Sequence, residues 1–256
     1  METFWIKPKL YFGPEPMAAL DQLAGKRVLI VTDAFLASSG LLDRVKNRLT
    51  GAVEIFDQVE PDPSLRLVAQ GVRMLRDFGP DAVVAFGGGS PMDCAKGMCW
   101  FSDRHPPLWC IPTTAGTGSE VTSFAVLTDT DQGVKYPLVE EDLLPEAAIL
   151  DASLLEGVPP HVTADTGMDV LTHAAEAVAA KGASPFSDAL AEKAFALAYR
   201  RPPEAGRPSK TCCWPPVWQV WPSMPPGWGS VIRWHTPWAG GSTCPMGGST
   251  RCCCPA

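Results

Sequence analysis

Short apolar runs alternate with segments of helical periodicity along the first part of the chain. Each run has the length of a buried strand and ends at a polar residue or a glycine. The predicted strands are Val28–Val31, Val53–Phe56, Asp81–Phe86 and Pro107–Pro112. Apolar residues at positions 41, 42, 45 and 49 predict a helix after the first strand, and a second helix is predicted to begin at Ser64. Strands that alternate with helices favour a parallel sheet with both faces covered.

The pattern becomes purely helical in the later part of the chain. Residues 164–180 and 185–199 both have helical periodicity, and no strand pattern lies between them. We therefore predict an α/β domain with a Rossmann-like parallel sheet over residues 1–151, followed by the start of an all-helical domain over residues 152–200. That helical domain is expected to be truncated, because the periodic pattern stops at its end.

The composition breaks near Arg200. Residues 201–256 contain eleven prolines and six of the nine tryptophans, and they lack Leu, Asp, Phe and Asn. No helical or strand period runs through them, and prolines at this density remove backbone donors and block helix interiors. A proline-rich linker is the alternative, although linkers avoid Trp and Cys. We predict that this tail is disordered, forms no packed domain and leaves apolar helix faces before Arg200 uncovered.

Charge and composition favour a small-molecule protein of the cytoplasm. A net charge of -7 gives no basic footprint for nucleic acid. No secretory signal pattern opens the chain and no apolar run is long enough to span a membrane, so no membrane partner is expected. Cys94, Cys99 and Cys110 are scattered through the α/β pattern while the other six cysteines crowd into the tail, so the cysteine count indicates no disulfide framework.

A glycine-rich loop follows the third predicted strand and leads into a helix. Gly87, Gly88 and Gly89 have no side chains, so a phosphate can approach the backbone, and free N–H groups at a helix start bind anions. Ser90 is predicted to cap the helix and Asp93 to complete a capping box. A tight turn before a well-capped helix is the alternative, because this is not the Gly-x-Gly-x-x-Gly fingerprint.

Polar residues also follow the first and fourth strands. Asp33 lies where an open α/β sheet binds the ribose of a nucleotide, although an aspartate that caps a loop is equally consistent with its position. Thr113, Thr114, Thr117 and Ser119 belong to a run of small hydroxyl and glycine residues that can wrap phosphate and nicotinamide ribose. Solvent-facing turns use the same residue types, so the local pattern leaves both readings open.

A carboxylate and an imidazole stand four residues apart in the first helix of the second domain. Asp169 and His173 therefore leave the same helix face and can meet one metal ion. A hydrogen bond on the helix surface is the alternative.

Three long segments together carry a family resemblance. Gly87–Lys96, Ile111–Thr122 and Thr163–Ala177 resemble the iron-containing (group III) alcohol dehydrogenases in order and spacing. The resemblance runs from the first residues to about Arg200, and it is strongest to the 1-propanol dehydrogenases of propanediol utilisation. It implies an α/β domain that binds NAD(H) and a helical domain that supplies an Asp and three His to one Fe(II).

The resemblance also assigns residues by position. Asp169 and His173 match the first two metal ligands. The positions that fall in the cofactor-binding segments are Asp33, Gly87, Gly88, Gly89, Ser90, Asp93, Thr113, Thr114, Thr117, Ser119 and Lys135. The metal, Fe(II) with Zn(II) as the alternative, would act as a Lewis acid while hydride passes between NAD(H) and a small aliphatic alcohol or aldehyde such as 1-propanol or propanal. A homo-oligomer and association with a bacterial microcompartment are further expectations of the resemblance.

The tail departs from the family. Relatives continue with a helix of the kind Ala-Gly-Leu-Gly…His and then Phe-His-x-Pro-His-Gly, which supplies the last two iron ligands. The codons of Trp234–Pro237 and Cys244–Gly247, read from each third base, can encode Ala-His and Pro-His-Gly. Extending that frame over Trp221–Cys254 restores both metal motifs at family spacing. We infer a frameshift between about Tyr199 and Trp221 and expect the chain as written to be inactive.

Two alternatives stay open at this point. One is a nucleotide-binding remnant without catalysis, and the other is a polyol dehydrogenase similar to glycerol dehydrogenase, which a preference for zinc would favour. The sequence also leaves open the exact substrate, the choice between NAD and NADP, the direction of the reaction and the oligomeric state.

Overall fold

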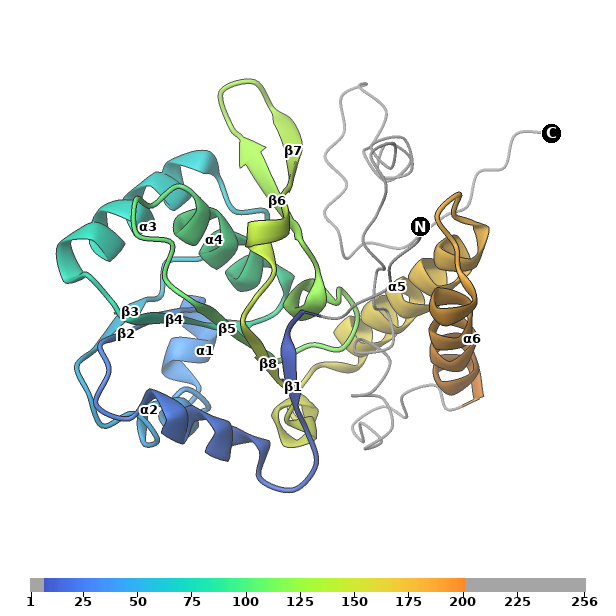
Figure 1. Ribbon diagram of the computed structural model, residues 1–256, viewed down its shortest axis with the longest axis horizontal. Helices are drawn as coiled ribbons and strands as arrows, with labels where there is room; N and C mark the ends of the chain where they lie inside the picture. Colours follow the sequence, from blue (N-terminus) through green and yellow to red (C-terminus); the bar gives the residue numbers. More distant parts are fainter. Residues whose placement is uncertain (1–6, 201–256) are drawn as a thin grey trace.

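Six parallel strands form one sheet in the computed structural model, which describes residues 7–200 of the chain (Figure 1). In spatial order the strands are β1 (Lys9–Tyr11), β8 (Ala147–Ile149), β5 (Leu108–Pro112), β4 (Ala82–Gly87), β2 (Val28–Val31) and β3 (Val53–Phe56). Val28 pairs with both Val53 and Ala82, so β2 lies between β3 and β4. The predicted Rossmann-like parallel sheet is confirmed.

Helices cover both faces of the sheet (Figure 1). On one face lie η1 (Pro16–Leu23), α1 (Ala34–Ser38) and α2 (Asp43–Lys46), and on the other lie α3 (Leu65–Phe78) and α4 (Gly89–Trp100). Side chains alternate along each strand, so Ile30 and Val84 pack in the first layer while Val31 and Val83 pack in the second. Burial on both faces explains why these strands are continuous apolar runs.

The helix predicted to begin at Ser64 is α3. The Ser64 hydroxyl accepts a hydrogen bond from the backbone N–H of Leu67 at 3.1 Å, which satisfies one free donor at the helix start. Gly79 ends the helix with a φ of 62°, a left-handed conformation that glycine adopts without strain. The helix predicted from the apolar residues at 41–49 forms, but it is shorter than expected, because α2 spans only Asp43–Lys46. Gly40, with a φ of 78°, separates it from the preceding helix α1.

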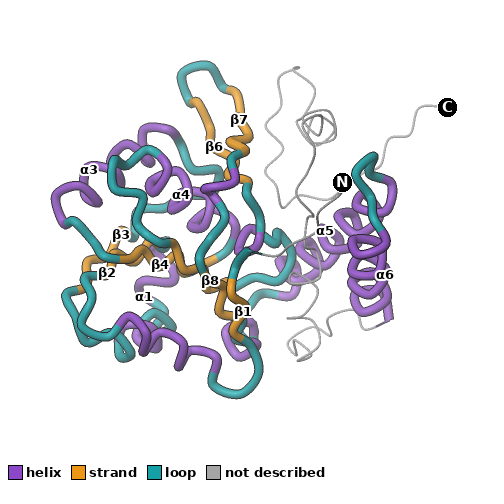
Figure 2. The backbone as a smooth tube through the Cα atoms, in the orientation of Figure 1, coloured by secondary structure: helices purple, strands orange, loops and turns teal. Residues whose placement is uncertain are grey.

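Several elements have no counterpart in the predicted pattern. β6 (Phe124–Asp129) and β7 (Val134–Val139) form an antiparallel hairpin that stands apart from the parallel sheet (Figure 2). The short helices η2 (Ser119–Val121) and η3 (Glu141–Leu143) flank this hairpin. β1 and β8 are only three residues long, too short to show a period.

Two long helices follow the sheet, as expected for the start of a helical domain. They are α5 (Pro160–Ala179) and α6 (Pro185–Arg200), preceded by η4 (Ala152–Leu155), and they pack together through small side chains such as Ala174 and Ala194. Neither helix, nor any other within residues 7–200, has the length and apolar character needed to cross a membrane. The predicted disorder and lack of packing of residues 201–256 lie outside the described residues.

Large apolar side chains are exposed on both of these helices. Met168 and Val178 of α5 and Phe186, Phe195 and Tyr199 of α6 each have between 42% and 70% of their surface accessible. A globular protein rarely leaves such a set uncovered.

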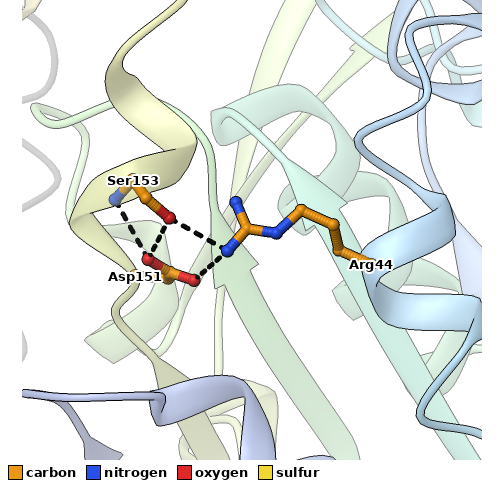
Figure 3. A network of polar contacts seen from close by, with 3 residues as sticks. All are labelled: Arg44, Asp151 and Ser153. Atoms are coloured by element: carbon orange, nitrogen blue, oxygen red, sulfur yellow. Dashed lines mark hydrogen bonds and ion pairs between the residues drawn. The ribbon is translucent and has the colours of Figure 1, made fainter.

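The start of the helical segment is fixed to the α/β part by an ionic network (Figure 3). The Arg44 guanidinium of α2 donates hydrogen bonds to the Asp151 carboxylate at 2.8 Å and to the Ser153 hydroxyl at 2.9 Å. Asp151 in turn accepts hydrogen bonds from the backbone N–H and hydroxyl of Ser153. The chain therefore leaves the sheet in a fixed direction.

Candidate functional site

The site residues gather at the carboxyl edge of the sheet, where the strand order reverses. From β2 the chain passes outward to β3 and then returns to the other side of β2 as β4. The carboxyl ends of β2 and β4 therefore flank a topological switch point, which is where open α/β sheets bind ligands. Asp33 follows β2, and Gly87 ends β4.

The glycine loop, Gly87–Gly89, has a conformation that side chains would disrupt. A Cβ on Gly87 would lie 2.6 Å from Cγ of Pro91, closer than real Cβ atoms come to any such neighbour. Gly88 is the N-cap of α4, and no side chain caps this helix. The predicted capping box of Ser90 and Asp93 is therefore wrong. The free N–H groups at the start of this helix stay available to an anion.

A threonine loop, residues 113–118, faces the glycine loop. A Cβ on Gly88 would lie 3.2 Å from Oγ1 of Thr114, and a Cβ on Gly89 would lie 3.2 Å from Cγ2 of Thr117. The threonine loop thus presents the hydroxyl of Thr114 and the methyl group of Thr117 to the bare backbone of the glycine loop, across a space that would barely hold one methyl group.

The threonine loop also touches helix α5. A Cβ on Gly116 would lie 2.6 Å from Cβ and 2.8 Å from the carbonyl oxygen of Thr166. Only glycine fits at this position. Because the threonine loop contacts the glycine loop on one side and Thr166 on the other, it lies between the start of α4 and α5. Asp169 and His173 follow Thr166 within the next two turns of α5.

Asp93 does not cap its helix, because it belongs to a buried ionic cluster. Its carboxylate accepts hydrogen bonds from the Ser119 hydroxyl at 2.8 Å and from the Val126 backbone N–H at 3.1 Å. Lys96, one turn later and 1% exposed, donates to Ser119 Oγ at 3.1 Å and to the Phe124 carbonyl at 2.7 Å. Burial raises the pKa of Asp93 and lowers that of Lys96, and the opposite charge of the partner counteracts both shifts.

Glu120 is a third buried charge beside this cluster. It is 1% exposed, and its Oε1 has no hydrogen-bond partner. Burial raises the pKa of Glu120 to about 7, although its own backbone N–H and the charge of Lys96 lower it. Because Asp93 and Lys96 already neutralise each other, a proton on Glu120 leaves the whole cluster without net charge.

The raised pKa of Glu120 predicts a stability that falls as pH rises. The unfolded carboxyl ionises near pH 4.5, whereas the folded chain keeps the proton until about pH 7. Between these values the folded state binds more protons, so the free energy of unfolding decreases with pH and levels off above pH 7. We expect the free energy of unfolding, measured with urea, to decrease by about 2 to 3 kcal/mol less between pH 5 and 8 in Glu120→Gln than in the unsubstituted chain. Glu156→Gln, at an exposed position, is the control, and equal pH dependence in the two variants would contradict the assignment.

Asp33 caps helix α1, which agrees with the capping alternative that its position in the sequence left open. Its carboxylate accepts a hydrogen bond from the Leu36 backbone N–H at 2.8 Å. A cavity of about 720 Å³ begins directly after it at Ala34 and continues along the loop after β3 to Asp62. Lys135 of β7 forms an ion pair with Asp62 at 2.7 Å, and Asp62 lines this cavity, so Lys135 lies at its rim.

The two candidate metal ligands are neighbours on α5. Oδ1 of Asp169 and Nε2 of His173 are 3.6 Å apart, so the predicted shared face is confirmed, and a surface ion pair accounts for the same geometry. A carboxylate and an imidazole suit Fe(II) or Zn(II). Within residues 7–200, however, no group of three or more potential ligands comes together, so these residues do not complete a metal site.

The fold is of the α/β class that binds nucleotides at a switch point of the sheet. A family model described as iron-containing alcohol dehydrogenase matches residues 7–152, and one for the C-terminal part of that family matches residues 163–207. The chain belongs to the iron-containing alcohol dehydrogenase family. The predicted family resemblance is confirmed.

Similar proteins agree with this assignment. The 1-propanol dehydrogenase PduQ of Salmonella typhimurium is 46% identical over 211 residues, which cover 80% of this chain and 57% of that protein. The NADPH-dependent butanol dehydrogenase of Clostridium saccharobutylicum is 38% identical over 77% of this chain and 57% of its own length. The structure of sulfoacetaldehyde reductase from Bifidobacterium kashiwanohense in complex with NAD+ superposes with a TM-score of 0.80 at 30% identity, covering 86% of this chain and 66% of that one. The chain thus spans less than two thirds of these relatives.

The structure brings most of the predicted site residues to one place. Asp33, the glycine loop, Ser90 and the threonine loop share the carboxyl edge, while Ser119 and Asp93 lie beneath them in the ionic cluster. Lys96 and Glu120 were not predicted as functional. One feature of the sequence could have indicated Lys96. It is the single charge within the otherwise apolar stretch Cys94–Trp100, and a charge that is buried there requires a partner.

Proposed function

We propose that the chain is the cofactor-binding part of an NAD(H)-dependent iron-type dehydrogenase for short aliphatic aldehydes and primary alcohols, and that it is inactive as written. The observation that carries the proposal is the pair of facing loops at the switch point. Gly88 and Gly89 have no side chains that would keep a pyrophosphate from the uncapped N–H groups at the start of α4, and the hydroxyl of Thr114 lies on the neighbouring loop. When bound, the nicotinamide supplies or accepts hydride.

The preference for NAD(H) over NADP(H) rests on Asp33. An acid at this strand end accepts hydrogen bonds from ribose hydroxyls and repels a 2′-phosphate. We expect Asp33→Ser to weaken NADH binding and to lower the ratio of NADPH to NADH dissociation constants by at least about tenfold, measured by fluorescence titration. Serine still caps α1, so a loss cannot be ascribed to the helix.

Asp43→Ser provides a matched control. It removes one exposed acid from the first turn of α2, where Asp43 forms an ion pair with Lys46. An equal change of the ratio in both variants, or none in Asp33→Ser, would refute the assignment of Asp33.

The metal site requires more than the described residues supply. We propose that Asp169 and His173 are two of its ligands and that the remaining ones are those lost with the reading frame. The family match names iron, and Zn(II) gains no support from the relatives. The relatives named for 1-propanol and butanol favour short aliphatic substrates. A homo-oligomer, a cytoplasmic location and association with a microcompartment stay predictions.

The nucleotide-binding remnant is the second candidate function. It is favoured by the incomplete donor set on α5 together with an intact carboxyl edge. The polyol dehydrogenase has no comparable support.

A further inference from the structure

A buried hydrogen-bonded cluster connects α4 to the segment that follows the threonine loop. We propose that its members Asp93, Lys96 and Ser119 are positioning residues that hold the threonine loop at the correct distance from the glycine loop and so set the affinity for the cofactor. The inference rests on the proposed binding of NAD(H) at these loops.

The proton of the Ser119 hydroxyl is committed to this cluster. It is donated to Asp93 Oδ1 at 2.8 Å, and an ionised carboxylate can only accept. The same oxygen accepts a hydrogen bond from Lys96 Nζ at 3.1 Å. Ser119 is 6% exposed, so its hydroxyl is directed toward α4 and has no proton left for a phosphate oxygen.

Lys96 and Asp93 together fix the backbone beyond Ser119. Lys96 Nζ lies 2.8 Å from the Thr122 carbonyl and 2.7 Å from the Phe124 carbonyl, and Asp93 accepts from the Val126 N–H. Only acceptors surround the amino group of Lys96 and only donors reach the Asp93 carboxylate, an arrangement that suits the ionised form of each group. Charge-assisted hydrogen bonds of this kind are about twice as strong as neutral ones.

The other end of the threonine loop is fixed by the sheet. The Thr113 N–H donates to the Gly87 carbonyl at 2.9 Å, which continues the pairing of β4 and β5. The loop is therefore held at one end by the sheet and at the other by the cluster. With both ends held, Thr114 and Thr117 stay within 3.2 Å of the positions where side chains on the glycine loop would begin.

A positioning role differs from a purely structural one in what it changes. Replacing a whole buried ion pair by apolar groups often leaves the free energy of unfolding unchanged. Maintaining the fold therefore does not by itself require these charges. A shift of a few tenths of an ångström in the threonine loop, in contrast, changes the narrow space between the loops. A positioning role therefore predicts a loss of cofactor affinity in addition to any loss in the free energy of unfolding.

The test compares two buried serines in the full chain. Ser119→Ala removes the shared hydroxyl, and Ser102→Ala is the matched control, because Ser102 is 5% exposed and donates to the Cys99 carbonyl at 2.8 Å, at the far end of α4. We expect the NADH dissociation constant to rise on the order of tenfold in Ser119→Ala and to stay unchanged in Ser102→Ala. Ser119→Thr, which keeps the hydroxyl, should restore affinity.

Hydrogen exchange provides a second readout. The amides of residues 113–118 should exchange faster in Ser119→Ala than in Ser102→Ala at equal global stability. Equal NADH affinities and equal loop exchange in the two alanine variants would overturn the inference. If the unsubstituted chain binds no NADH, the proposed function fails, and the exchange rates alone decide whether the cluster holds the loop.

Discussion

A frame-corrected chain is expected to bind about one Fe(II) and to reduce propanal with NADH, whereas the chain as written is expected to do neither. The physical reason is the number of ligands. A complete site contributes about 10–16 kcal/mol of apparent binding free energy in zinc peptides. A site with Asp169 and His173 alone should bind the metal with several kcal/mol less free energy, so the chain should hold no stoichiometric metal. Metal analysis and an aldehyde-reduction assay on both proteins provide the measurement.

His173→Ala in the corrected protein separates the metal from the cofactor. It should abolish reduction of propanal while NADH binding is largely retained, because His173 lies on α5 and the glycine loop opens α4. If the uncorrected chain carries a full metal complement and turns over at a comparable rate, both the frameshift and the ligand assignment have to be given up.

The second large effect is expected from Gly88→Val, which should abolish NADH binding. Its Cβ would lie 3.2 Å from Thr114 Oγ1, and the two further methyl groups of valine would fill the space between the loops. Titration of NADH fluorescence measures the loss. Gly157→Val is the matched control, since a side chain at that position meets nothing within 4 Å. Unchanged binding in Gly88→Val would remove the assignment of the glycine loop.

The strands at the centre of the sheet could be predicted from the sequence, and those at its margin could not. Val28–Val31 and Ala82–Gly87 are buried on both faces and therefore read as unbroken apolar runs. β7 carries exposed apolar residues such as Val134 and Tyr136, so it shows no clean alternation. The split between α1 and α2 depends on the left-handed conformation of Gly40, which the apolar spacing does not encode.

The candidate site shows the same division between local and distant interactions. The glycine loop and the threonine run were visible because each is continuous in sequence. The capping role predicted for Asp93 is wrong because its partners, Ser119 and Val126, are 26 and 33 residues away along the chain. A capping box is a local pattern, and here a tertiary contact replaces it.

Chimaeric dehydrogenases that join this chain to a relative should not be cut at residue 151. The contact between Gly116 and Thr166 crosses that point, and it leaves no room for a Cβ. A foreign helix with a different tilt, or a loop with any side chain at residue 116, would displace the threonine loop. A junction beyond α5 keeps the two matched surfaces in one piece. In this chain the exchangeable module is therefore bounded by a backbone contact and not by the change from strands to helices.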